Sequence, residues 1–159
     1  LIATFESWEE DARNKEEARV LAIKDAAMRQ IASSAAVIRW SPDETKFMVV
    51  ESSSVKVYDL EDKQSFSTNK QSFSTNKTEY SLPPARVHIW LPDSRHVILV
   101  EEGTISIVDF DGTNKAIIYA GSFQDNFVFP WSDSSRLVII SSFPTPTASK
   151  PNLYGINLK

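Results

Sequence analysis

Three segments of the chain share one pattern, in which a β-rich run leads into a tight turn centred on aspartate and two further β-rich runs follow. The segments are Val37–Leu60, Val87–Phe110 and Phe127–Leu158. Each run is short and largely apolar, so a single unit cannot bury both of its faces. The pattern therefore predicts β-sheets that stack on one another in chain order.

The spacing of the turns fixes the length of the repeat. Asp43 and Asp93 lie 50 residues apart, and Asp93 and Asp133 lie 40 apart. The longer interval contains an exact tandem duplication of QSFSTNK, residues 64–77, and without one copy it is 43. Several short strands in a repeat of about 40 residues are typical of β-propeller blades. The sequence thus predicts a mainly β fold of three antiparallel propeller-type blades, residues 36–83, 84–121 and 122–159, in a partial or oligomer-completed propeller.

The blades differ in their expected number of strands. Four strands are predicted in the second blade, at Val87–Trp90, His96–Glu101, Thr104–Phe110 and Lys115–Tyr119. The first blade has the same plan, with Thr78–Leu82 as its outer strand, whereas the third ends after its third strand. A blade without an outer strand has an open edge, and the short apolar segment Leu1–Phe5 is a candidate strand to close it.

Residues 1–35 are predicted to form a separate unit, made of that opening strand and one amphipathic α-helix. Ser7 and Glu10 have the spacing of a capping box, and acids precede bases by four residues, as in Asp25 and Arg29. An apolar stripe at helical spacing follows, at Val20, Ile23, Ala27 and Ile31. The helix is expected over residues 8–32, with the stripe packed on the propeller body or, alternatively, docking a partner.

The turns resemble those of a known family. Trp40-Ser41-Pro42-Asp43 and Trp90-Leu91-Pro92-Asp93, each followed by an aliphatic strand and then by VYDL or IVDF, resemble the W-S-P-D-G repeats of TolB-type β-propellers. The runs LVEEGTISIVDFDGTNKAIIYAG, FVFPW and PNLYGINLK are more similar still to the C-terminal propeller region of PEGA-domain proteins from uncultivated bacterial lineages. The resemblance covers residues 37–159. The chain departs from the W-S-P-D-G repeat in two ways. The glycine after Pro-Asp is replaced by Glu44, Ser94 and Ser134, and the third unit lacks the proline.

The resemblance implies a non-catalytic scaffold for protein–protein interaction or assembly in the bacterial cell envelope, extracytoplasmic or membrane-anchored, with its anchor and other blades upstream. The W-S-P-D pattern belongs to the folding of a blade, so no functional residue is transferred and the partner-binding residues stay unknown. Two copies of the chain, with three blades each, would supply six blades. The alternative is an accessory substrate-binding or gating domain of a larger enzyme whose catalytic part is absent from this chain.

Composition and motifs point away from several other functions. A net charge of −4 and a pI near 5.2 lack the basic footprint of a nucleic-acid binder. No apolar run approaches the roughly 20 residues that span a bilayer. The absence of cysteine excludes thiol nucleophiles and thiolate metal sites. G-x-S-x-G, Walker and G-x-G-x-x-G motifs are also missing, so no catalytic, cofactor-binding or metal residue is assigned.

Two groups of polar residues are interpreted as structural. His88 and His96 lie on adjacent predicted strands, but a pair without a clear third ligand is more often structural than a metal site. The run Asp109–Asn114 looks like a calcium loop, yet it lacks the distal bidentate glutamate, and a hairpin turn explains it better.

The tryptophans recur with the repeat. Trp40, Trp90 and Trp131 are predicted to pack between blades, because each ring buries a large area. An aromatic-lined mouth for a sugar or peptide is the alternative interpretation. Trp8, near the start of the helix, is a candidate staple against the body.

Overall fold

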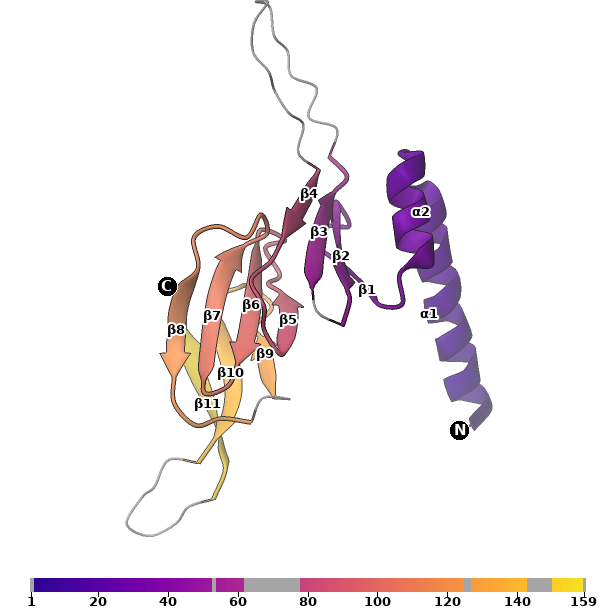
Figure 1. The fold of residues 1–159 in the computed structure, drawn as a ribbon. Helices are drawn as coiled ribbons and strands as arrows, with labels where there is room; N and C mark the ends of the chain where they lie inside the picture. Colours follow the sequence, from indigo (N-terminus) through magenta and orange to yellow (C-terminus); the bar gives the residue numbers. More distant parts are fainter. Residues whose placement is uncertain (1, 53, 62–77, 125–126, 143–149, 159) are drawn as a thin grey trace, which may run out of the picture.

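The computed structural model describes residues 2–52, 54–61, 78–124, 127–142 and 150–158. Within these ranges the fold is mainly β, with three antiparallel sheets and two helices (Figure 1). The helices are α1 (Ile2–Ala22) and α2 (Ala26–Ser34). The duplicated QSFSTNK segment lies outside the described residues.

The strands follow one another as antiparallel neighbours, so each sheet is built from one repeat of the sequence. The first sheet contains β1 (Ile38–Trp40), β2 (Lys46–Val50), β3 (Val55–Asp59) and β4 (Glu79–Ser81). The second contains β5 (Val87–Trp90), β6 (His96–Glu101), β7 (Thr104–Asp109) and β8 (Ala116–Ala120). The third contains β9 (Val128–Pro130), β10 (Arg136–Ser141) and β11 (Asn152–Asn157), in the order β11-β10-β9. The predicted four, four and three strands are confirmed.

The helical unit differs from the prediction at both of its ends. Ile2–Phe5 belong to α1, so the expected opening strand is wrong, and α1 begins at the far side of the molecule from β11 (Figure 1). Ser7 lies inside α1 and cannot form a capping box with Glu10. Closure of the third sheet by the opening segment is therefore excluded in this structure.

The single helix predicted over residues 8–32 is also wrong, because the chain breaks between α1 and α2. Asp25 caps the N-terminus of α2, and its carboxylate accepts a hydrogen bond from the Met28 amide at 2.9 Å. The Arg29 guanidinium turns back and donates to the Ile23 carbonyl at 2.8 Å, where α1 has just ended. The two residues interpreted as an ion pair within one helix instead stabilise the ends of two.

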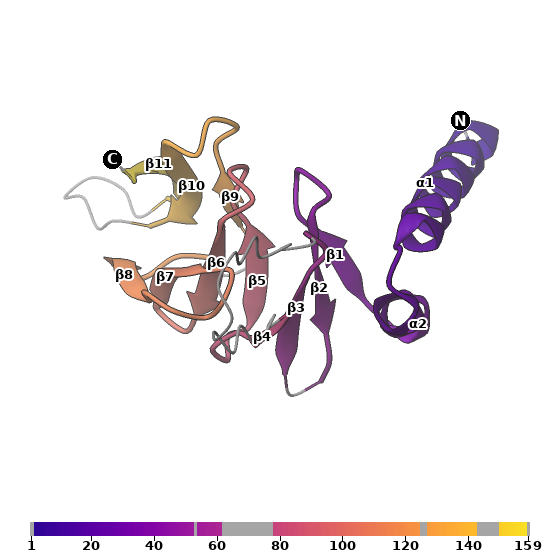
Figure 2. The ribbon, with the colours of Figure 1, turned by 90° about the horizontal axis from the view of Figure 1, so that it is seen from above.

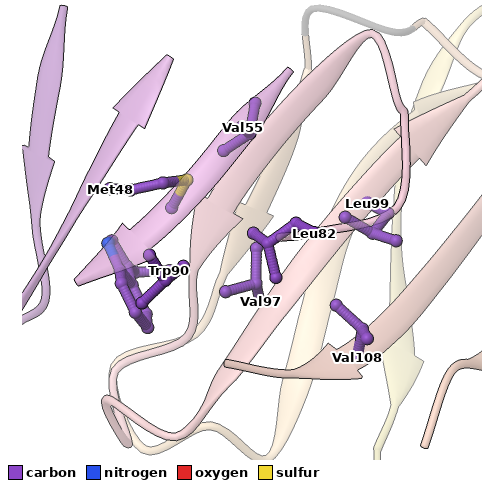
Figure 3. Packing of buried hydrophobic residues seen from close by; sticks show 8 residues of the cluster. Met48, Val55, Leu82, Trp90, Val97, Leu99 and Val108 are labelled. Carbon is purple, nitrogen blue, oxygen red and sulfur yellow. The ribbon is translucent and has the colours of Figure 1, made fainter. Parts of the chain in front are cut away.

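The three sheets pack face to face in chain order and form an open stack (Figure 2). We call the face of a sheet that is turned toward the next repeat its forward face, and the opposite face its rear face. The forward face of the first sheet packs against the rear face of the second through Met48, Val55, Val57, Trp90, Val97, Leu99 and Val108 (Figure 3). The forward face of the second packs against the rear face of the third through Ile98, Val100, Ile105, Val128, Leu137 and Ile139.

The turn after the first strand has the same geometry in all three sheets. The aspartate carboxylate accepts a hydrogen bond from the amide two residues later, at 3.0 Å for Asp43, 2.9 Å for Asp93 and 2.9 Å for Asp133. The residue directly after each aspartate has a left-handed backbone, with φ of 60° at Glu44, 58° at Ser94 and 57° at Ser134. The glycine of the W-S-P-D-G pattern is therefore replaced in sequence while its backbone conformation is kept.

Candidate functional site

The two ends of the stack are finished in different ways. At the first sheet, α2 and the end of α1 cover the rear face, where Phe47, Val49 and Tyr58 pack against Ile23 and Ala32. Phe47 and Tyr58 stack with ring centroids 5.0 Å apart. Val20 and Ile31 join this cluster, so three of the four predicted stripe residues pack on the body, whereas Ala27 is exposed.

At the third sheet, none of the described elements covers the forward face. Phe129 is 52% exposed and Leu153 is 63% exposed. Phe129 lies opposite Val138, and Leu153 lies opposite Ile140, so these four apolar side chains share one face. The rings of Phe127 and Phe129 pack in a T-shaped arrangement with centroids 4.9 Å apart. We call these five residues the open face.

The repeat shows what normally covers such a face. By the spacing of the turns and the strand registers, Phe129, Val138 and Ile140 correspond to Ile89, Ile98 and Val100, and Leu153 corresponds to Ile105. In the second sheet Ile98, Val100 and Ile105 are fully buried under the rear face of the third. The forward faces of the first and second sheets are therefore buried against the next sheet, whereas the equivalent face of the third sheet is exposed.

The three tryptophans do not occupy equivalent positions. The backbone amides of Ser41, Leu91 and Trp131 make the same hydrogen bond across the turn, so Trp131 aligns with Leu91 and not with Trp90. The one-residue offset reverses the face on which a strand side chain lies. Trp131 is 52% exposed, with the Arg136 guanidinium 6.0 Å from its ring centroid, and its predicted packing between sheets is wrong.

Trp90 behaves as predicted, and Trp40 does not. Trp90 is buried between the first and second sheets, and its indole Nε1 donates to the Arg39 carbonyl at 3.0 Å. The Arg39 guanidinium in turn donates to the His88 carbonyl at 2.7 Å, so the two sheets are joined in both directions. Trp40 packs instead with Phe47 and the helices. Trp8 is 61% exposed, so most of its surface is not packed on the body.

A cavity of about 610 Å³ lies between the helices and the rear side of the first sheet. Its wall is apolar at Ile23, Met28, Trp40 and Leu60, and its charged residues are Arg19, Lys24, Asp25, Glu44, Asp59 and Glu61. Arg19 donates from Nη2 to the Glu44 carboxylate. Within the described residues, Arg19 Nε and Trp40 Nε1 are buried nitrogen donors without a hydrogen-bond partner. Unpaired buried donors are uncommon in folded proteins.

The two histidines are held in separate structural roles. The His88 imidazole is buried, and its Nε2 lies 2.9 Å from the Pro83 carbonyl, which can only accept, so Nε2 carries the proton. His96 lies between two carboxylates, with Nδ1 2.6 Å from Asp93 and Nε2 3.2 Å from Asp109. Among the described side chains no group of three potential ligands is placed to hold a metal ion.

We expect His88 to make the stability of the fold depend on pH. Burial lowers the pKa of its imidazole below the usual value of 6.5, and this outweighs the hydrogen bond to Pro83. The unfolded chain then binds a proton more readily than the folded chain, so the free energy of unfolding should fall as the pH drops below about 6.5. His88→Gln, which keeps a donor for Pro83, should reduce the loss of thermal stability between pH 7 and pH 5.

His96→Gln is the matched control for that experiment, because the chain has only two histidines. Of the two variants, His88→Gln should show the smaller loss of melting temperature between pH 7 and pH 5. Equal slopes in the wild type and in His88→Gln would show that another group titrates in this range.

The run Asp109–Asn114 forms the hairpin turn between β7 and β8, as predicted. The Asp111 carboxylate accepts hydrogen bonds from the amide and hydroxyl of Thr113 at 2.9 and 2.6 Å. Asn114 donates to Asp109 at 2.7 Å. The carboxylates that resemble calcium ligands in sequence are thus used within the turn itself.

The fold and its surfaces define a mainly β protein built from a stack of repeated antiparallel sheets. No family model and no curated protein matches the sequence. Within the described residues, no helix combines the length and the apolar character needed to cross a bilayer.

Proposed function

We propose that this chain is a non-catalytic scaffold of β-propeller-type blades, and that it assembles with a second copy of itself through the open face. The observation that carries the proposal is the exposure of Phe129 and Leu153 at positions that correspond to buried residues of the second sheet. The placement in the cell envelope rests on the resemblance to TolB-type and PEGA-domain propellers alone.

A second copy fits the open face for two physical reasons. The five residues of the face are uncharged, so within this patch two copies meet no like charges, and Arg136 adjoins the patch on the same face of β10. A patch used by both partners in a twofold arrangement needs only to complement itself, and flat apolar sheet faces pack on each other in β-sandwiches. The rear face of the first sheet is not available to a second copy, because α2 covers it.

The absolute mass in solution tests this assembly. Size-exclusion chromatography with light scattering should give a dimer of twice 17.9 kDa for the wild type. Leu153→Asp should give a monomer, because a carboxylate buried at an apolar interface loses its hydration without gaining a partner. Its melting temperature should stay close to that of the wild type at a concentration where the wild type is dissociated, since Leu153 is already exposed in the single chain.

Ile117→Asp is the matched control. Ile117 is a 68% exposed strand residue on β8, away from the open face. This variant should remain dimeric. A monomeric wild type at high protein concentration, or a dimer that persists in Leu153→Asp, would refute assembly through the open face.

A further inference from the structure

A pair of polar residues interrupts the apolar contact between the first and second sheets. By the spacing of the aspartate turns, Arg39 on the forward face of the first sheet corresponds to Ile89 of the second. His88 on the rear face of the second sheet corresponds in the same way to Val128 of the third. Where the second and third sheets meet, Ile89 and Val128 belong to one apolar cluster. The chain therefore places an arginine and a histidine where its own repeat has aliphatic residues.

The His88 side chain uses only part of its hydrogen-bonding capacity. The residue is 4% exposed, and among the described residues only Nε2 has a partner, the Pro83 carbonyl. Because Nε2 carries the proton, Nδ1 is left as an acceptor. The buried side-chain nitrogens without a partner in the described residues are Arg19 Nε and Trp40 Nε1, so Nδ1 keeps accessible surface. A polar group in such a buried place normally has a partner, which here can come from a ligand.

A cavity of about 540 Å³ lies beside the Arg39 and His88 pair. It is formed by the hairpin between β2 and β3 and by the connection from β4 to β5, at the end of the sheets opposite the aspartate turns. Its volume is in the range of small-molecule sites. Three serines, Ser52, Ser54 and Ser81, bring hydroxyl groups to its lining.

The charges of the lining favour a ligand with one carboxylate. The lining contains two cations, Arg39 and Arg86, and one carboxylate, Glu51. Arg86 is compensated from outside the lining, because its Nη2 donates to Glu102 at 2.7 Å. Arg39 is exposed and forms no ion pair with a described residue, and its Nη1 donates to the His88 carbonyl at 2.7 Å. The rest of its planar guanidinium can therefore bind a carboxylate.

The acceptors of the lining require that the same ligand also donates hydrogen bonds. His88 Nδ1 can only accept, and an ionised carboxylate has no proton to give it. The Glu51 carboxylate is a second acceptor, which already receives the Ser54 hydroxyl at 2.8 Å. Hydroxyl groups on the ligand would satisfy both acceptors, since a hydroxyl donates and accepts. A carboxylate without hydroxyls would satisfy Arg39 alone.

We propose that this cavity binds a sugar acid, a small molecule with one carboxylate and several hydroxyl groups. The carboxylate pairs with the Arg39 guanidinium, and a neighbouring hydroxyl donates to His88 Nδ1. The other hydroxyls exchange hydrogen bonds with Glu51 and the three serines. The cavity lies between the first and second sheets, away from the open face, so this binding does not depend on the dimer proposed above.

Nuclear magnetic resonance of the histidine rings in the full chain tests this binding, with D-gluconate as the probe. The two histidines give two sets of ring signals, which His96→Gln assigns. Titration at constant pH and ionic strength should shift the His88 signal in a saturable way. The His96 signal should not move, because His96 is not part of the lining. Hexanoate has the same charge without the hydroxyls, and sorbitol has hydroxyls without the charge, so each should bind at least about tenfold more weakly.

Three variants, measured by calorimetry with D-gluconate, separate the parts of the recognition. Arg39→Gln should weaken binding about tenfold or more, because the hydrogen bonds to the carboxylate lose their charge. Arg95→Gln is the matched control, since it removes the same charge from an exposed arginine outside the lining, and its affinity should equal that of the wild type. His88→Val introduces the residue that the repeat has at Val128, and it should weaken binding about threefold to tenfold.

Three results would each overturn the proposal. They are the lack of a saturable shift at His88, binding of hexanoate or sorbitol as tight as that of D-gluconate, and equal affinities in Arg39→Gln and Arg95→Gln. None of these results changes the mass measured for the open-face variants, so the two proposals are judged separately.

Discussion

Replacing Trp90 with alanine should lower the free energy of unfolding by about 3–5 kcal/mol, the usual cost of removing a large buried aromatic side chain. Trp90 fills the contact between the first and second sheets and packs with Met48 and Val97. Its removal also leaves the Arg39 carbonyl without the indole donor. Chemical denaturation monitored by circular dichroism measures the loss.

Trp131→Ala is the matched control, because both tryptophans adjoin the same kind of turn. Trp131 is 52% exposed, so its replacement should cost less than about 1 kcal/mol. If the two substitutions were equally destabilising, the one-residue offset of the third tryptophan would not have the structural effect described above.

Gly112→Ala should be the other strongly destabilising substitution. Gly112 lies in the turn between β7 and β8 with φ of 84°, and a Cβ atom there would come within 2.5 Å of the Ser81 carbonyl oxygen in β4. The left-handed backbone costs about 1–2 kcal/mol for a residue with a side chain, and a clash with fixed backbone adds about 1–3 kcal/mol. The melting temperature should fall accordingly.

Gly103→Ala separates those two costs. Gly103 also has a left-handed backbone, with φ of 65°, but the nearest atom to its added Cβ, the Gly121 carbonyl oxygen, is 3.7 Å away. This variant should show the backbone cost alone. A loss at Gly103 equal to that at Gly112 would mean that the contact of the turn with β4 does not matter for stability.

The strands could be predicted because local pattern and packing agree in them. In β6 and β7 the apolar residues lie on both faces, since each face meets another sheet, and the Asp111-Gly112 turn sets their connection to β8. Because the first and third sheets are built from the same repeat, the same strand assignment applies to them. The aspartate turns follow from the same logic, because a short carboxylate side chain reaches the backbone amide two residues later.

The helical unit was harder to predict because its local signals fit more than one structure. Asp25 and Arg29 are four residues apart, which suits an ion pair within a helix equally well as a cap and a backbone contact at a break. The short apolar segment at Ile2–Phe5 is compatible with either a strand or a helix, and in the structure it belongs to α1.

The candidate sites needed knowledge of what lies beside each sheet. Alternation along Arg136–Ser141 places Val138 and Ile140 on one face, but sequence alone does not say that this face is uncovered. Among the described residues, Trp40 Nε1 lacks an acceptor on the side where helices, and not a sheet, pack against the first sheet. A signal was nevertheless present in the third turn, where proline and not tryptophan aligns with Trp90.

Because α2 covers the first sheet, the stack can be extended only from the third sheet. A chain with both terminal faces bare could add copies head to tail without limit and form a filament. In this chain α2 covers one end of the stack. When two copies join through their open faces, helices cover both outward ends of the pair. In the proposed dimer, this helix of nine residues would therefore end the stack and limit assembly through the open face to a closed pair.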